Sequence, residues 1–131
     1  MNIDQPLNAL PYTVTFENRQ DYLYASVVTT KNKPEVLIAY WRAIADAVNE
    51  RSARRLLVEK GSAPEASTAD AFTVAAALRE MGFDGIPIAL VKHAAVTAES
   101  QRFVENVARN RGVMMSIFEN VADAESWLRK T

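Results

Sequence analysis

The sequence predicts a single α/β domain in which helices pack against a five-stranded, mostly parallel sheet. Short apolar or β-branched segments alternate with amphipathic segments in the order β-β-α-β-α-β-α-β-α. The chain has 131 residues, enough for one domain, and its 49% apolar and 24% charged residues are typical of a folded protein. No repeat or low-complexity segment divides it. We expect an N-terminal arm over residues 1–11 and one domain over residues 12–131.

The first two strands form a predicted hairpin. Residues 12–16 (YTVTF) are β-branched and aromatic, which is typical of a strand. Residues 17–20 are polar and are predicted to turn, and residues 21–29 (DYLYASVVT) form the second strand. A connection this short joins antiparallel strands, so we expect the first strand to lie antiparallel to the rest of the sheet.

A long amphipathic helix follows over residues 35–50. Pro34 suits its first turn, where the missing N–H is not needed. Apolar residues then recur at i, i+3 and i+4 spacing, which predicts a face packed on the sheet: Leu37, Tyr40, Trp41, Ile44 and Val48.

The next strand and helix are shorter. Residues 55–59 (RLLVE) predict a buried strand. Ser67 or Thr68 is expected to cap the second helix, which stops at Gly82. Residues 87–91 (PIALV) predict the fourth strand.

The C-terminal third completes the alternation. Thr97 is expected to cap a third helix that ends at Gly112. Residues 113–118 (VMMSIF) predict the fifth strand, and Asn120 is expected to cap a last helix. Strands that alternate with helices imply parallel pairing through right-handed crossovers.

This element order resembles the STAS-type fold of anti-sigma-factor antagonists, and most of all the SpoIIAA-like subgroup, which is also linked to the CRAL-TRIO lipid carriers. The residues that carry the resemblance are 54–58 (RRLLV), 102–112 (RFVENVARNRG), the strand to Phe118, and the pair Trp127-Leu128. The resemblance implies a non-catalytic regulatory module that binds a protein partner. A fold alone does not fix a function, so this remains an expectation.

The resemblance also implies a phosphorylation switch at the start of the second helix. The family carries a Ser or Thr there, inside an Asp-Ser-Ser-Gly-like turn, and an added phosphate breaks the complex with the partner. The matching stretch in this chain reads Ala66-Ser67-Thr68-Ala69-Asp70, so the motif is degenerate. Ser67 and Thr68 are the candidates for a switch or a partner contact, and the alternative is that both only cap the helix.

The lipid-carrier part of the resemblance implies an alternative function, binding or sensing a lipid-like apolar small molecule. Its pocket would lie between the sheet and its helices. The alternative for these side chains is ordinary core packing. The candidate lining residues are Tyr40, Trp41, Phe72, Phe103, Met114 and Phe118.

The chain lacks the residues that several kinds of catalytic, metal-binding and phosphate-binding sites require. The chain has no cysteine and one histidine, His93, which excludes thiol catalysis and multi-histidine metal centres within one chain. No Gly-rich phosphate loop or hydrolase elbow occurs. We therefore expect no enzyme activity, no metal and no cofactor. His93 follows the fourth strand, and a general base there, beside Ser62, Glu59 or Asp84, is the weakest hypothesis.

The net charge of −1 attracts neither nucleic acid nor an anionic membrane at long range. Arg51, Arg54 and Arg55 cluster around the end of the first helix, where cations suit the negative helix pole. We interpret them as solvated side chains rather than a nucleic-acid site.

The sequence also bears on location and assembly. The N-terminus lacks a secretory signal and no apolar run approaches the ~20 residues that span a bilayer, so a cytoplasmic location without an integral membrane segment is expected. A homodimer is a further expectation, since Tyr40, Trp41 and Trp127 are large enough to pack across a two-fold interface.

Overall fold

The computed structural model describes residues 11–30, 33–61, 68–93 and 98–131. The strands are β1 (Tyr12–Arg19), β2 (Tyr22–Thr29), β3 (Leu56–Lys60), β4 (Ile88–Lys92) and β5 (Met115–Phe118). The helices are α2 (Pro34–Glu50), α3 (Thr68–Arg79), α4 (Ala98–Asn110) and α5 (Val121–Arg129). Within the described ranges no helix is both long and apolar enough to cross a membrane. The predicted α/β fold class is confirmed.

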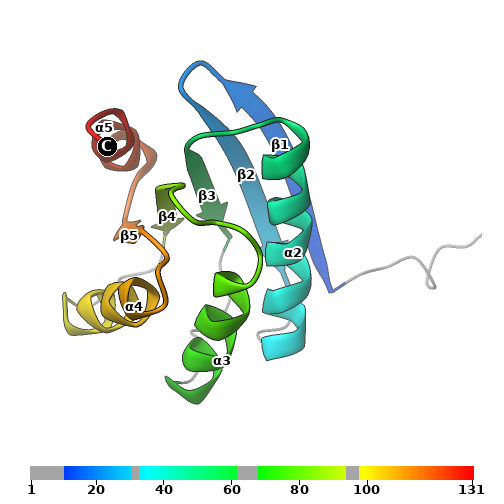
Figure 1. Cartoon of the computed structure of the whole chain (residues 1–131), viewed down its shortest axis with the longest axis vertical. Coiled ribbons are helices and arrows are strands. Elements are labelled where there is room, and N and C mark those ends of the chain that lie inside the picture. Colours follow the sequence, from blue (N-terminus) through cyan, green and yellow to red (C-terminus); the bar gives the residue numbers. More distant parts are fainter. Residues whose placement is uncertain (1–10, 31–32, 62–67, 94–97) are drawn as a thin grey trace, which may run out of the picture.

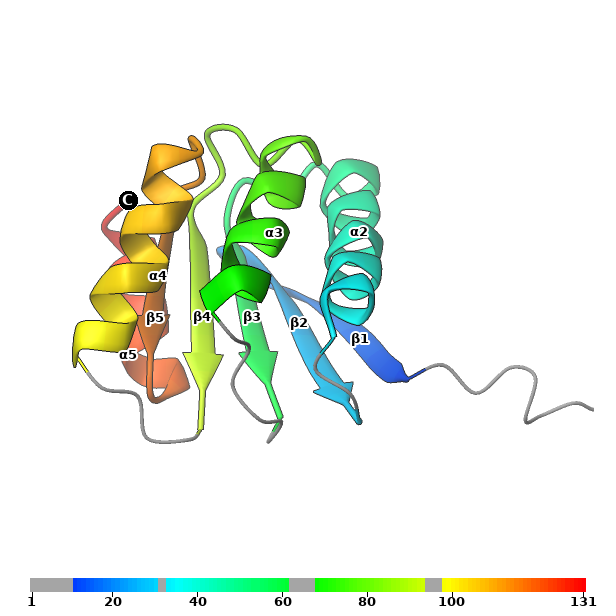
Figure 2. The same cartoon turned by 90° about the horizontal axis from the view of Figure 1, so that it is seen from below.

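The sheet has the strand order β1-β2-β3-β4-β5, with β1 antiparallel to β2 and the other neighbours parallel. Each crossover therefore moves one strand further in the same direction. Connections of one hand that all advance in one direction leave their helices on one face of the sheet. Figure 2 shows α2, α3 and α4 side by side on that face and α5 behind the β4–β5 side.

Two apolar clusters hold the layers together. The larger lies between the sheet and α2, α3 and α4, and its fully buried members include Tyr40, Ile44, Leu56, Val58, Phe83 and Ile88. The smaller lies between the sheet and α5 and contains Tyr22, Leu57, Ala89, Val91, Ala124 and Leu128. Apolar side chains alternate between these clusters along β3 and β4, so these two strands are buried on both faces.

The predicted turn over residues 17–20 is wrong, because β1 continues to Arg19 and only Gln20 and Asp21 connect the strands. The polar end of β1 is held by side-chain contacts. The Arg19 guanidinium lies 3.8 Å from the centre of the Tyr24 ring and its Nε donates to Glu17 at 3.0 Å. Polar residues suit this part of the strand because α5 does not cover it.

Helix ends follow the predicted chemistry. Pro34 occupies the first turn of α2, and the Asn120 side chain accepts a hydrogen bond from the Asp123 N–H at 2.8 Å, as expected for a cap. Thr97 lies outside the described residues. Helix α2 ends with an Ala53 N–H bond to the Val48 carbonyl. That is the Schellman arrangement, in which the residue past the helix takes a positive φ.

Candidate functional site

Side chains of α4 bond the β5 edge of the sheet at Ile117. The Ile117 N–H donates to Glu105 Oε2 at 3.0 Å, and the Ile117 carbonyl accepts from Gln101 Nε2 at 3.0 Å. Gln101 and Glu105 thus occupy backbone groups with which an additional strand would otherwise form hydrogen bonds. Covering an edge in this way is a means by which proteins prevent unwanted strand pairing.

The β1 edge is open as far as the described residues are concerned. The Thr30 N–H donates to the Pro11 carbonyl at 3.0 Å, which identifies that pair as hydrogen-bonded. Hydrogen-bonded and non-hydrogen-bonded pairs alternate along an antiparallel ladder, so every second residue of β1 turns its N–H and C=O away from β2. In the described part of the chain, no residue bonds to these outward backbone groups. They belong to Tyr12, Val14, Phe16 and Asn18.

The sheet face behind this edge is also only half covered. Helix α5 packs on β3, β4 and β5. The corresponding face of β1 and β2 carries exposed cross-strand neighbours, and Val28 has 56% of its surface exposed. Figure 1 shows β1 and β2 projecting beyond α5. An open backbone edge and an open, largely polar face therefore adjoin. Exposed β1 side chains on the face are Thr13, Thr15 and Glu17.

A line of polar contacts crosses this face. The Tyr24 hydroxyl donates to Glu59 Oε1, and Glu59 Oε2 contacts His93 Nε2. Glu59 is in β3 and His93 directly follows β4, so both stand at the carboxyl ends of parallel strands. Ligands of open α/β sheets bind outside those ends, at a point where the strand order reverses. The order here does not reverse.

Hydrogen bonding controls the ionisation of this line. The Tyr24 hydroxyl that donates to Glu59 holds the pKa of the carboxyl below its usual range. Partial burial opposes this effect, and His93 adds to it. Burial and the Glu59 carboxylate together raise the pKa of Tyr24, which stays a neutral donor at pH 7. Glu59 is therefore an ionised acceptor that two neighbours hold in place.

The surroundings of Tyr24, Glu59 and His93 limit the reactions that these three side chains could catalyse. Glu59 could orient His93 as a carboxylate orients a general base, but half of the His93 side chain is exposed (52%). Among the described residues, no group of three or more His, Cys, Asp or Glu side chains could hold a metal ion. Of the partners suggested by sequence, only Glu59 contacts His93. Asp84 precedes β4, at the opposite end of that strand, and Ser62 lies outside the described residues.

A second network joins the hairpin to α5. The Tyr22 hydroxyl donates to Glu125 and accepts from Arg19 Nη1 at 3.2 Å. Arg129 of α5 pairs with Asp21 in the turn, with 3.2 Å between Nε and Oδ2. These contacts fix the position of the β1–β2 turn against α5, so the hairpin is anchored to the helix at its turn end.

The residues proposed from sequence to line one apolar pocket are separated by the sheet. Tyr40 and Trp41 are buried on the α2 side, where the Trp41 and Phe83 rings meet edge to face at 5.9 Å. Phe118 packs on Trp127 on the opposite side, with 5.7 Å between ring centres. Tyr40 and Phe118 therefore do not line one cavity.

The remaining predicted residues lie elsewhere. Phe103 in α4 is half-buried, and Met114 has 50% of its surface exposed beside Trp127 in an open depression of about 350 Å³. Phe72 belongs to α3, but its side chain is outside the described structure. Thr68 is the first residue of α3, and Ser67 lies outside the described residues, so the phosphorylation switch stays a prediction.

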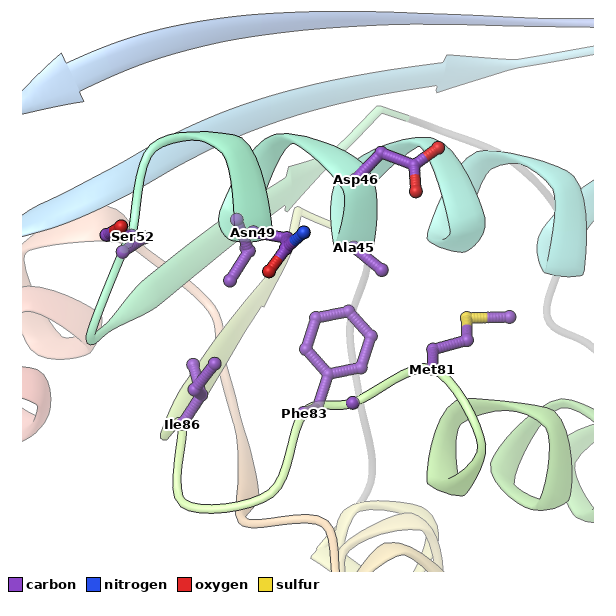
Figure 3. Close-up of a pocket in the computed structure, with 10 residues that line it drawn as sticks. Ala45, Asp46, Asn49, Ser52, Met81, Phe83 and Ile86 are labelled. Atoms are coloured by element: carbon purple, nitrogen blue, oxygen red, sulfur yellow. The ribbon is translucent and has the colours of Figure 1, made fainter.

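A further depression of about 370 Å³ lies between the end of α2 and the segment that joins α3 to β4. Figure 3 shows Phe83 and Ile86 on one side of it and the polar Asp46 and Asn49 of α2 on the other. Phe83 is also a member of the main core cluster. We interpret this depression as the open rim of the core.

Sequence reasoning missed Tyr24, Arg19 and the outward backbone of β1. The signal for Tyr24 was present, because alternation along DYLYASVVT places Tyr22 and Tyr24 on one face. That Glu59 would meet Tyr24 depends on the lateral pairing of β2 with β3, which a single sequence does not specify.

Comparison with known proteins identifies no family. No family model matches the chain, and no curated protein matches it at a significant level. Among solved structures, it is similar to the Thermus thermophilus RuvC structure, at 13% identity and a TM-score of 0.33, over 92% of this chain and 85% of that one. At these values the likeness supports no conclusion about fold or function.

Proposed function

We propose that this protein is a non-catalytic regulatory module that binds a partner protein, and that the partner adds an extended segment to the open edge of β1. Strand addition to an exposed edge is a recurrent mode of protein recognition, in which main-chain hydrogen bonds supply affinity and alternate side chains supply specificity. The proposal agrees with the function that the STAS resemblance implies.

The contrast between the two sheet edges carries the proposal. Gln101 and Glu105 bond the N–H and C=O of Ile117 in β5, whereas the outward backbone groups of β1 have no partner within the described residues. β1 is also eight residues long, against four for β5. A long edge strand with free backbone groups can pair with strands of other chains, which makes it prone to aggregation. A partner that binds this edge would explain why the protein keeps such a strand.

The adjoining face gives such a segment side chains to contact. Thr13, Thr15 and Glu17 are exposed on β1, and Tyr24 on β2 lies opposite Glu17. A segment that pairs with β1 would place every second side chain beside this row. The hydroxyls and the carboxylate favour a partner segment with hydrogen-bond donors at those positions.

The test uses a substitution at an outward backbone position of β1, where the side chain also packs against the main core cluster. Val14→Pro removes an N–H that faces away from β2 and places a ring in the path of an added strand. Proline is tolerated at such a position on an edge strand. Val14→Ile keeps the N–H and is the matched control. Wild type and both variants would be immobilised and exposed to lysate of the native host, and retained proteins would be quantified by mass spectrometry.

We expect one protein to be retained by wild type and by Val14→Ile and to be reduced at least tenfold by Val14→Pro. Asn18→Pro repeats the test at another outward position if Val14→Pro does not fold. Equal retention by all variants would contradict the proposal. A second copy of this chain could pair with the edge instead of a partner protein. Native mass spectrometry detects that case, because pairing between the β1 strands of two copies would double the chain mass.

A further inference from the structure

A group of arginines surrounds an open depression at the end of the molecule where the β1–β2 turn lies. The depression has a volume of about 360 Å³ and lies between this turn and the loop that joins α2 to β3. Figure 1 shows the turn and the end of α2 together at the upper end of the domain. Four of its lining residues are Arg19, Arg51, Arg54 and Arg55.

Capping α2 does not require Arg51, Arg54 or Arg55, although their position in the sequence suits the negative helix pole. Backbone groups complete the helix end: the Arg51 N–H donates to the Ala47 carbonyl and the Ala53 N–H to the Val48 carbonyl, both at 3.0 Å. The last turn of α2 contains no basic residue. The guanidinium groups are therefore available for another role.

Three of the guanidinium groups have no side-chain carboxylate as partner. Arg51 Nη1 donates to the amide oxygen of Asn18 at 2.9 Å. Arg55 donates through Nε and Nη2 to main-chain oxygens at the end of α5, each at 2.9 Å. Arg54 is exposed, and the described residues place no hydrogen-bond or ion-pair partner on it. Among the described residues, none of these three guanidinium groups pairs with an Asp or Glu side chain.

The carboxylates nearby are already engaged. Asp21, which also lines the depression, pairs with Arg129 at 3.2 Å. Glu17 pairs with Arg19, and the hydrogen bonds to the Tyr22 hydroxyl and to Glu17 raise the pKa of Arg19. Arg51 is held by the Asn18 amide and Arg55 by main-chain oxygens. Each guanidinium group has further N–H donors that these hydrogen bonds do not use. A small group of partly fixed cations with spare donors is suited to an anion that has several oxygen atoms.

We infer that this depression binds a phosphomonoester group. Arginine forks bind phosphate oxygens through paired hydrogen bonds, and a dianion with three terminal oxygens can use donors from Arg51, Arg54 and Arg55 together. The volume is within the range of small-ligand sites. Val14→Pro separates the two proposals, because Val14 takes no part in this depression, whereas Asn18 lines it.

The experiment is a titration of the ¹⁵N-labelled full chain, followed by amide shifts at constant ionic strength. One arm uses inorganic phosphate, a second a short phosphoserine peptide, and a third the same peptide without phosphate. The test variant is Arg51→Gln/Arg54→Gln. The control, Arg79→Gln/Arg102→Gln, removes the same charge from exposed positions on α3 and α4. Arg54→Gln alone serves if the double variant does not fold.

We expect saturable shifts around residues 18–23 and 51–55 with a phosphate-bearing probe. The affinity should fall at least tenfold in the test variant and stay within twofold in the control. The arm that binds more tightly distinguishes a phosphorylated protein from free phosphate as the source. Shifts that do not saturate, that also occur with the unphosphorylated peptide, or that are equal in both double variants would overturn the inference.

Discussion

The Tyr24 hydroxyl donates a hydrogen bond to Glu59 diagonally across the β2–β3 pair. This contact joins the half of the sheet that α5 leaves open to the half that it covers. The Glu59 carboxylate also contacts His93, so one side chain connects three neighbouring parts of the sheet. The resulting face is polar and fixed in position, which suits recognition of another protein better than binding of an apolar molecule.

The lowered pKa of Glu59 predicts a pH-dependent contribution to stability. A carboxyl whose pKa is depressed by folding stabilises the native state above its unfolded value, roughly 4.3, and loses that effect as the pH falls through the folded value. Wild type should therefore exceed Glu59→Gln in unfolding free energy at pH 7, and the difference should shrink towards pH 3. Urea unfolding at several pH values measures this, with Glu80→Gln as an exposed control. A difference that does not change with pH would contradict it.

Tyr40→Phe should stabilise the protein. The Tyr40 hydroxyl is buried and has no hydrogen-bond partner within the described residues; burial raises its pKa, and the adjacent Trp41 indole opposes this without reaching hydrogen-bond geometry. Removing an unsatisfied buried hydroxyl should increase the unfolding free energy by about 1 kcal/mol. Tyr22→Phe, which loses the bonds to Glu125 and Arg19, should decrease it by about 1 kcal/mol. Urea denaturation of both variants checks the opposite signs, and equal losses would refute the difference.

Arg55 and Arg54 are adjacent in sequence and should differ in their effect on stability. Arg55 bonds the main-chain oxygens of Leu128 and Thr131 at the end of α5, whereas Arg54 is exposed. Arg55→Ala should cost about 2 kcal/mol, because two charge-assisted hydrogen bonds are lost. Arg54→Ala should change stability by less than about 0.5 kcal/mol. Thermal and urea unfolding of the pair test this, and similar values for the two would be inconsistent with the contacts.

The residue after α2 offers a stabilising substitution. Ser52 has φ 52° and occupies the position that Gly112, at φ 78°, occupies after α4. A side chain in this region is strained by about 1 kcal/mol. Ser52→Gly should therefore raise the unfolding free energy by several tenths of a kcal/mol, and Gly112→Ala should lower it by about 1 kcal/mol. Denaturation midpoints would show these changes, and destabilisation by Ser52→Gly would disprove the role of φ.

The sequence predicted the order and type of the elements because their periodicity is strong. The period-two strands and the i, i+3, i+4 stripe of α2 depend on local spacing, which a single chain displays. The place of Pro34 in the first turn of α2 and the cap at Asn120 were predictable because both depend on local sequence. The end of β1 was missed because Glu17, Asn18 and Arg19 are polar and resemble a turn, although Tyr24 and Tyr22 hold them in the ladder.

The candidate site was only partly predictable. Glu59 was one of the hypothetical neighbours of His93, since Glu59 ends one predicted parallel strand and His93 follows another. The partner Tyr24 and the open edge of β1 depend on lateral strand order, and that order comes from tertiary packing. The separation of Tyr40 from Phe118 was not predictable either, because spacing along the chain does not say on which face of the sheet each side chain lies.

The most direct test of strand addition is amide hydrogen exchange along β1, with and without the protein that Val14→Pro fails to retain. Thr13, Thr15 and Glu17 already bond to β2, so the partner should change their exchange little. The outward amides of Val14, Phe16 and Asn18 should slow at least tenfold, because they gain main-chain partners. Unchanged exchange at these outward amides, together with protection elsewhere, would contradict the proposal that the partner adds a strand to β1.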